Sequence, residues 1–259
     1  MESDFLRDYT QEAVELMRKA DAGDAKAQYH FAMYLLKSDD PPYYRMELSP
    51  EEIERGMRYL HLSAAQGYCQ GVAADELGKI YYEGLIVPKD YKKAKLWYNT
   101  ALLKGIPISA YMLGECAYYG YGEDVDYEKA AKYYLQAASG YVNAIIRLGD
   151  MYIRGEYLPH DPAFAKKLYD HVISEEEWLY ASYGMYSDAN DEVLKRLDNL
   201  EQSEILPSSA PIKESEEQQA VRRTLEEIME KKRENHSSDD DYDFDDIDDD
   251  DEDYDNDDD

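Results

Sequence analysis

The chain has 259 residues and a formal net charge of −30, from 58 Asp and Glu against 28 Lys and Arg. A protein that binds phosphates needs a basic stripe, and none is visible, so this balance argues against nucleic acid and against an acidic membrane surface as ligands. Tyrosine is used 27 times, against 4 Phe and 2 Trp. A tyrosine ring can fill a gap between helices while its hydroxyl reaches water or a partner.

The cysteine usage and the N-terminal residues indicate the compartment. Cys69 and Cys116 are the only cysteines, and they stand in different phases of the pattern described below. Residues 1–8 are acidic and contain no apolar core of a signal peptide, and no apolar run approaches the ~20 residues of a membrane-spanning helix. We therefore expect two free thiols in a reducing compartment and a cytoplasmic protein.

The first elements along the chain are helical. Residues 10–23 place Ala13, Leu16 and Ala20 on one face of a helix, which predicts a half-unit at the start of a stack. A complete unit follows at about 25–68. Its two helices are separated by an insertion, 37–48, whose Pro-Pro pair cannot continue a helix. The insertion is either a tolerated surface loop or a binding loop at one rim, and the sequence leaves both alternatives open.

The clearest helix pair is the unit 73–105. Its first helix ends at Gly84, since only glycine enters the left-handed cap without strain. Asp90 is the predicted N-cap of the second helix. That helix carries apolar residues at spacings of three and four, which places them on one face, namely Ala94, Trp97, Tyr98 and Ala101. Gly105 closes the unit.

The same pattern returns 36 and then 35 residues later, in units 109–140 and 144–174. The matching positions are Leu113, Gly114, Gly120, Asp126, Ala130, Tyr134 and Gly140, and then Leu148, Gly149, Gly155, Asp161, Ala165 and Tyr169. A single helix pair cannot bury its apolar face, so repetition at this period predicts stacked pairs. We therefore predict an all-α fold, an α/α solenoid of helix-pair repeats over residues 10–203.

The C-terminal part departs from the repeat. A degenerate helix pair at 176–203 is expected to cap the stack, and residues 204–214 form a linker. Residues 215–235 predict an amphipathic helix that docks either on the solenoid or on a partner. The segment 236–259 contains 16 Asp or Glu and no Lys or Arg, so we expect a disordered acidic tail. It serves either for solubility or, through residues such as Phe244, as a short binding motif.

The repeated residues carry a family resemblance. Leu-Gly-x-x-Tyr-x-x-Gly, then Asp, then Lys-Ala-x-x-Trp/Tyr-Tyr-x-x-Ala and a closing Gly resemble the Sel1-like repeat, a relative of the tetratricopeptide repeat, across about residues 25–175. The resemblance implies a scaffold or adaptor for protein complexes. Some Sel1-like proteins are associated with hydrolase activity, chiefly secreted ones with closely spaced cysteine pairs, which this chain lacks.

The sequence contains no recognisable catalytic motif. There is no nucleophile elbow, no Cys-x-x-Cys, no zinc-binding His-Glu-x-x-His and no phosphate loop. His30 and His61 could approach each other, but a zinc site needs more ligands. We expect a protein that is not an enzyme and has no cofactor and no metal site, with a hydrolase as the alternative.

Binding is the remaining function, and the first helices of the pairs supply a surface for it. In a stack of pairs, residues two before, two after and five after the repeat leucine should line a concave groove. Tyrosine gives a large contact area, and charges fix the register of a bound chain. The predicted partner-binding residues are Tyr29, Met33, Lys79, Tyr82, Tyr111, Glu115, Tyr118, Asp150 and Ile153, with Leu36, Asp75 and Ile146 at the remaining positions. We expect a protein or peptide partner in this groove. A chaperone-like or inhibitory protein that binds basic partners through its tail is a further alternative.

Overall fold

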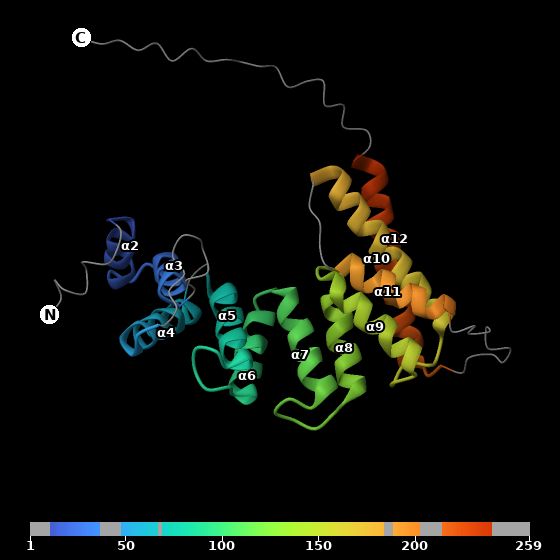
Figure 1. Cartoon of the computed structure of the whole chain (residues 1–259), viewed down its shortest axis with the longest axis horizontal. Helices are drawn as coiled ribbons and strands as arrows, with labels where there is room; N and C mark the ends of the chain where they lie inside the picture. The colour runs from blue at the N-terminus through green and yellow to red at the C-terminus, as the bar shows by residue number, and fades with distance from the viewer. Residues whose placement is uncertain (1–10, 37–47, 67–68, 184–188, 203–213, 240–259) are drawn as a thin grey trace, which may run out of the picture.

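A computed structural model describes residues 11–36, 48–66, 69–183, 189–202 and 214–239, and every regular element within them is a helix (Figure 1). The helices in chain order are α2 (Gln11–Asp21), α3 (Ala25–Leu36), α4 (Pro50–Ala65), α5 (Gln70–Glu83), α6 (Tyr91–Leu102), α7 (Pro107–Tyr119), α8 (Tyr127–Ala137), α9 (Val142–Arg154), α10 (Pro162–Tyr183), α11 (Ala189–Gln202) and α12 (Glu216–Asp239). The predicted all-α solenoid is confirmed.

The helices stack as sequential pairs. The first helices, α3, α5, α7 and α9, are called A helices here, and each packs mainly on the B helix that follows it, α4, α6, α8 or α10. Weaker contacts join each B helix to the next A helix. In Figure 1 the pairs follow an arc from α2 at one end to α10, α11 and α12 at the other. Each unit therefore buries apolar surface mainly between its own two helices and covers the rest against its neighbours.

The helix ends follow the repeat glycines and aspartates. Gly84 and Gly120 end α5 and α7 in the left-handed conformation, with φ of 71° and 72°. Asp90 caps α6 by accepting a hydrogen bond from the Lys93 amide at 3.0 Å, and Asp126 caps α8 through the Lys129 amide at 2.9 Å. These predicted boundaries are confirmed because they depend on local chemistry alone.

In three of the A helices, α5, α7 and α9, a glycine in the middle of the helix lies against a tyrosine of the following B helix. The pairs are Gly78 with Tyr98, Gly114 with Tyr134, and Gly149 with Tyr169, and in each a Cβ on the glycine would lie 2.5 Å from a ring carbon. Glycine inside a helix costs about 1 kcal/mol relative to alanine. The repeat keeps it because the buried ring occupies the space that a side chain would take.

The C-terminal cap differs from the prediction. α10 is one continuous helix from Pro162 to Tyr183, so the chain does not turn between the fourth unit and the expected first cap helix near residue 176. The physical reason is that residues 171–183 contain neither Gly nor Pro, whereas Gly105 and Gly140 end the preceding units. α11 then packs back on α10 and touches α9.

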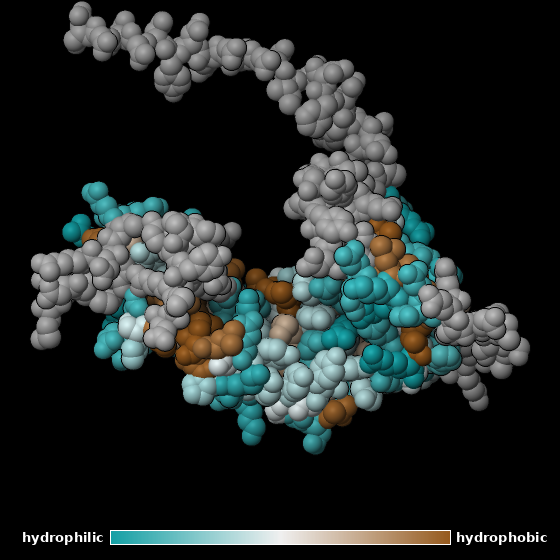
Figure 2. All heavy atoms as spheres, viewed as in Figure 1, coloured by the Kyte–Doolittle hydropathy of each residue, from teal (hydrophilic) through white to brown (hydrophobic). Residues whose placement is uncertain are grey.

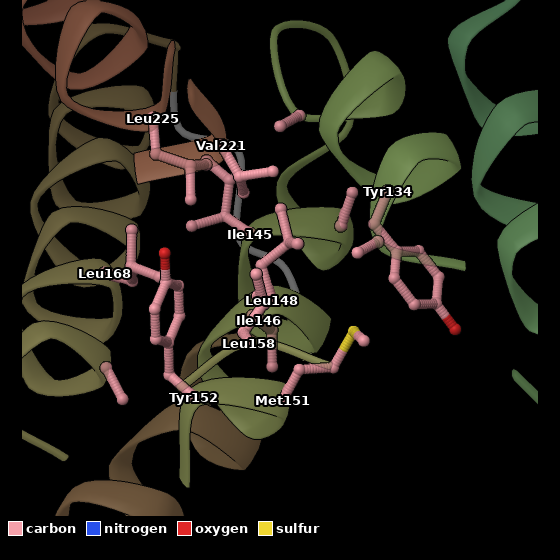
Figure 3. Close-up of a cluster of buried hydrophobic side chains, with 14 of the residues drawn as sticks. Tyr134, Ile145, Ile146, Leu148, Met151, Tyr152, Leu158, Leu168, Val221 and Leu225 are labelled. Atoms are coloured by element: carbon pink, nitrogen blue, oxygen red, sulfur yellow. The ribbon is translucent and has the colours of Figure 1, made fainter. Parts of the chain in front are cut away.

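The amphipathic helix α12 packs on the solenoid. Val221, Leu225 and Met229 are buried in the same apolar cluster as Ile145 and Leu168, and Figure 3 shows the α12 side chains facing those of α9 and α10. α12 extends to Asp239, past the expected start of the tail at 236. Almost all of the insertion 37–48 and of the linker, and the tail from residue 240, lie outside the described residues.

The buried core is not continuous along the stack. One cluster joins α2 through α6, with Phe31, Leu60 and Leu77 among its members. A second cluster joins α7 through α12 and includes Tyr134 and Leu168. Between them lies a small group made of Ala94, Tyr98 and Leu113. The packing therefore divides the molecule near the join between α6 and α7.

Candidate partner-binding surface

The predicted groove residues differ in exposure. Lys79 is exposed, with 49% of its side chain accessible. Five are half-buried, namely Tyr29, Met33, Tyr82, Tyr111 and Ile153. Three are buried, namely Glu115, Tyr118 and Asp150, and these bind residues of neighbouring units. Of the remaining positions, Leu36 and Ile146 are buried as well, and Asp75 is half-buried.

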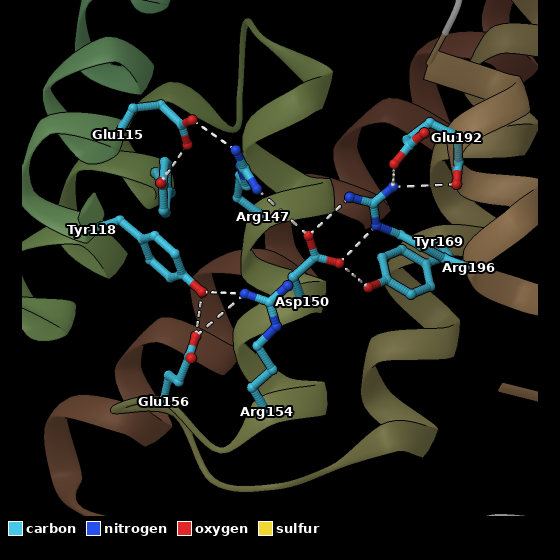
Figure 4. Close-up of polar contacts among 10 residues, drawn as sticks. Glu115, Tyr118, Arg147, Asp150, Arg154, Glu156, Tyr169, Glu192 and Arg196 are labelled. Atoms are coloured by element: carbon cyan, nitrogen blue, oxygen red, sulfur yellow. Dashed lines mark hydrogen bonds and ion pairs between the residues drawn. The ribbon is translucent and has the colours of Figure 1, made fainter. Parts of the chain in front are cut away.

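Glu115 on α7 ties three helices together. It accepts a hydrogen bond from the Tyr134 hydroxyl of α8 at 2.6 Å and forms an ion pair with Arg147 of α9 at 2.7 Å (Figure 4). Burial alone would lower the pKa of Arg147, but the bond to Glu115 and its charge outweigh burial and raise it. The arginine therefore stays charged and joins the third unit to the fourth.

Asp150 on α9 repeats this arrangement one unit later. It accepts a hydrogen bond from the Tyr169 hydroxyl at 2.7 Å, and Arg196 of α11 donates to its two oxygens at 2.7 and 3.0 Å. We call the tyrosine, carboxylate and arginine a junction triad. Because Arg196 takes the role that Arg147 has one unit earlier, α11 acts on this surface as the next A helix.

The unit 73–105 lacks a junction triad. By repeat position, Lys79 stands where the carboxylate is, and Met112 stands where Arg147 is. The hydroxyl of Tyr98 is buried and has no hydrogen-bond partner among the described residues. Burial raises the pKa of this tyrosine above its ordinary value, so the hydroxyl stays protonated and able to donate. The Lys79 ammonium instead lies 3.9 Å from Glu83 of its own helix.

A tyrosine ridge lies where α5 and α7 end and their loops begin. It consists of Tyr82, Tyr91, Tyr118, Tyr119, Tyr121 and Tyr127. Tyr91 and Tyr121 are stacked with ring centroids 4.7 Å apart, and Tyr119 stacks on Tyr121 at 5.4 Å. The ridge is continuous across two units and presents exposed ring surface, with Tyr119 43% accessible.

Cations and apolar side chains flank this ridge. The Lys89 ammonium lies 5.5 Å from the Tyr91 ring centroid, and the Arg147 guanidinium lies 5.6 Å from that of Tyr119. Leu85 in the loop before α6 is 83% accessible, and Figure 2 shows brown apolar surface in this region. Such a mixture of aromatic, apolar and cationic groups is typical of protein-binding surfaces.

A cavity of about 550 Å³ opens between α9, α10 and α11. The predicted residues Asp150 and Ile153 line it, together with residues that were not predicted to bind a partner, Arg154, Tyr169, Glu192, Lys195, Arg196, Asn199 and Leu200. Three of its charged groups bind one another, since Arg196 binds both Asp150 and Glu192, the latter at 2.6 Å. Arg154 donates to the Tyr118 hydroxyl, which in turn donates to Glu156 at 2.5 Å.

Sequence reasoning singled out two members of the ridge, Tyr82 and Tyr118, as residues of a concave groove, but it did not predict the ridge and missed Tyr91, Tyr119 and Tyr121. It also missed that Arg147 and Arg196 would hold Glu115 and Asp150 inside the fold. The sequence did contain a sign of the first triad. When the repeats are aligned, Glu115 and Asp150 occupy the same position as Lys79, so two units have a carboxylate where the third has a cation. The partner arginines lie 32 and 46 positions away from their carboxylates, and no local pattern reports such distances.

The described residues contain no group of His, Cys, Asp and Glu able to hold a metal ion. The ring of His61 packs on Trp97 with centroids 5.1 Å apart, and burial lowers the pKa of His61. Cys69 and Cys116 are both free and buried. Among the same residues, no helix has the length and apolar character that crossing a membrane requires.

Stacked helix pairs with an aromatic A-helix surface define this molecule as an α-solenoid repeat protein. The model of the Sel1 repeat matches residues 46–68, 71–106, 107–140 and 142–170. The chain is a Sel1-repeat protein.

The relatives share part of this array. Protein sel-1 homolog 2 of Homo sapiens is 38% identical over 84 residues, which is 32% of this chain and 12% of that protein. The ERAD-associated E3 ubiquitin-protein ligase component HRD3B of Arabidopsis thaliana is 35% identical over 82 residues, 31% of this chain and 13% of that one. Among solved structures, the uropathogenic Escherichia coli antigen c5321 has a TM-score of 0.55 at 26% identity, covering 74% of this chain and 40% of that one.

Proposed function

We propose that this protein is a non-enzymatic scaffold or adaptor that binds a peptide or protein partner along its A-helix surface. The observation that carries the proposal is the tyrosine ridge, continuous across two units and flanked by Lys89, Lys79 and Arg147. Stacked tyrosines offer a large contact area at low entropic cost, and cations at the edge set the orientation of a bound chain. The junction triads hold the α7–α11 part of the surface in one geometry.

The family supports a role in assembly. Sel1-repeat proteins are generally protein–protein interaction scaffolds. The Arabidopsis relative is named as a component of a ubiquitin ligase, although the match spans 13% of it. The partner of the present chain is proposed by chemistry only, as a peptide or protein segment that meets tyrosine rings and lysines.

The hydrolase alternative has less support. Burial raises the pKa of Cys116 to about 12, which leaves its thiol protonated and unreactive at neutral pH. In the cavity between α9 and α11, Asp150 and Arg196 bind each other. The free cysteines support our proposal of a cytoplasmic location. A role for the tail in binding basic partners remains an alternative proposal, and that segment lies outside the described residues.

Affinity capture with variants of the ridge tests the proposal. Tyr82→Ala combined with Tyr119→Ala should remove the partner from the captured set while the helical circular dichroism spectrum stays unchanged. Tyr133→Ala, which changes a half-buried tyrosine of α8 outside the ridge, is the matched control and should retain the partner. Equal recovery of every captured protein by the folded ridge variant and the control would contradict binding on this surface.

A further inference from the structure

The unit 73–105 differs in charge from the rest of the array. It contains six lysines and four carboxylates, a net charge of +2, whereas unit 109–140 has two lysines and five carboxylates, a net charge of −3. The units 25–68 and 144–174 are not positive either, with net charges of −1 and 0. In a chain of charge −30, the positive unit is the one that carries Lys79, Lys89 and half of the tyrosine ridge.

The same unit has a vacant acidic position. In two other A-to-B pairs, α7–α8 and α9–α10, Glu115 or Asp150 binds the B-helix tyrosine. In α5–α6 the acid is replaced by Lys79, and the hydroxyl of Tyr98 has no partner among the described residues. A buried hydroxyl without a partner is destabilising, because it loses its hydrogen bonds to water and gains none in the fold. A carboxylate brought to this surface by another segment would meet the exposed side chain of Lys79.

The chain itself contains a segment with matching chemistry. Residues 240–259, which follow α12, hold 15 Asp or Glu and no cation, together with the aromatic residues Tyr242, Phe244 and Tyr254. We propose that this segment docks on the basic part of the ridge, formed by Lys79, Lys89, Tyr82, Tyr91 and Tyr121, and competes there with the partner. This regulation rests on the proposed function, since it concerns the same surface.

The length of the segment permits this contact. α12 touches α8, and three helix spacings of about 10 Å, roughly 30 Å in total, separate α8 from α5. The 24 residues of α12 add at most about 36 Å. Added end to end, these two lengths place the ridge at most about 66 Å from the end of α12. Residues 240–259 extend to at most about 70 Å, and Tyr254 to at most about 53 Å, so only the distal part of the segment can reach the ridge.

Other cations that lie closer to residues 240–259 are less available to bind this segment than Lys89 is. Lys231, Lys232 and Arg233 lie at the end of α12, directly before the segment, but Glu230 and Glu234 flank them. Lys232 is already paired with Glu175 at 3.0 Å. Lys89, by contrast, is exposed and contacts a tyrosine ring.

Photo-crosslinking in the full-length protein tests the docking without any partner. A photoreactive phenylalanine analogue replaces Tyr254, and mass spectrometry locates the crosslinked peptides in a mixture of isotopically light and heavy chains. We expect intrachain crosslinks to residues 79–95 and 119–122. Their yield should fall about three- to ten-fold in 0.5 M salt, because screening weakens contacts between exposed charges.

Charge-reversal variants make the test specific. Lys79→Glu with Lys89→Glu should lower the crosslink yield by a similar factor, while Lys26→Glu with Lys167→Glu, an equal charge change at exposed positions elsewhere, should not. Crosslinks confined to α12, crosslinks between light and heavy chains, or a yield indifferent to the ridge variant would each overturn the proposal. If the crosslinks show docking but affinity capture recovers no partner, the proposed function is refuted and the docking stands. If a partner binds equally well with and without residues 240–259, the proposed competition between the segment and the partner is refuted, and the proposed function stands.

Discussion

At the scale of single residues, Lys79 marks the repeat position at which the junction triad is missing. Its position holds a carboxylate in the two following units, where the tyrosine hydroxyl and an arginine meet it. Here the hydroxyl of Tyr98 stays buried and unpaired. This unit therefore lacks a hydrogen bond at the same place where it exposes a cation. Binding sites often contain such locally destabilising features, because the residues that bind a partner are not those that would be most stable in the free protein.

Rebuilding the triad should therefore stabilise the protein. Lys79→Glu combined with Met112→Arg supplies both missing partners, and we expect the free energy of unfolding to rise by about 1–2 kcal/mol in urea titrations, since charged hydrogen bonds contribute this much. Lys79→Met is the matched control, because it removes the lysine but supplies no acceptor for Tyr98. A rebuilt variant no more stable than this control would show that Tyr98 is satisfied by some other group.

Cys116 makes stability depend on pH in the alkaline range. Burial raises its pKa from 9.0 to about 12 in the folded protein, so below pH 9 the thiol is protonated in both states and the stability is fully present. Between pH 9 and about 12 the unfolded chain loses this proton and the folded chain keeps it, so stability falls as pH rises. The slope for one such group is at most about 1.4 kcal/mol per pH unit.

Urea midpoints measured from pH 8 to 10 check this dependence. Cys116→Ala should be less stable at pH 8, because a buried side chain is truncated, but should lose less further stability by pH 10 than the wild type. Buried tyrosines also begin to ionise in the unfolded chain near pH 10, but both proteins contain them, so their contribution cancels in the comparison. Parallel pH curves for the two proteins would assign the alkaline loss to groups other than Cys116.

At the scale of elements, Arg222 holds α12 on the solenoid. Its guanidinium lies 4.1 Å from the Phe164 ring centroid, 2.8 Å from Asp161 and 2.5 Å from Glu214. Arg222→Ala should release α12 at a cost of about 1–3 kcal/mol, seen as faster amide hydrogen exchange along α12 with little change in α5 and α7. The neighbouring Arg223 is exposed, and Arg223→Ala should leave exchange unchanged. Equal protection of α12 in both variants would contradict this role for Arg222.

The elements also show what the sequence could predict. The A and B helices and their caps at Gly84, Gly120, Asp90 and Asp126 follow from spacing and cap chemistry within a few residues, so local reasoning suffices. The continuation of α10 to Tyr183 was missed because an expected repeat was given more weight than the lack of a helix-ending residue. The docking of α12 and the burial of Glu115 and Asp150 depend on partners far along the chain. Burial of this kind removes predicted groove residues from the surface.

At the scale of the whole molecule, the core of fully buried apolar residues and the series of junction triads are interrupted at the same place. The apolar core divides into a cluster over α2–α6 and a cluster over α7–α12, joined through the small group around Tyr98 and Leu113. The junction triad is missing at this join, while triads tie α7 to α9 and α9 to α11. In a solenoid, stability is close to a sum of units and neighbouring interfaces, so a weak interface separates cooperative blocks.

We therefore expect two cooperative blocks, residues 11–105 and 107–239. Native-state hydrogen exchange in low urea should resolve two groups of amides with different free energies of opening, and the boundary between them should fall at α6–α7. Restoring the triad with Lys79→Glu and Met112→Arg strengthens the interface between the blocks, so the two groups should move toward a single opening energy. Lys79→Met, which leaves the interface without a triad, should keep them apart. A single group of amides in the wild type would show that the small cluster around Tyr98 couples the two cores by itself.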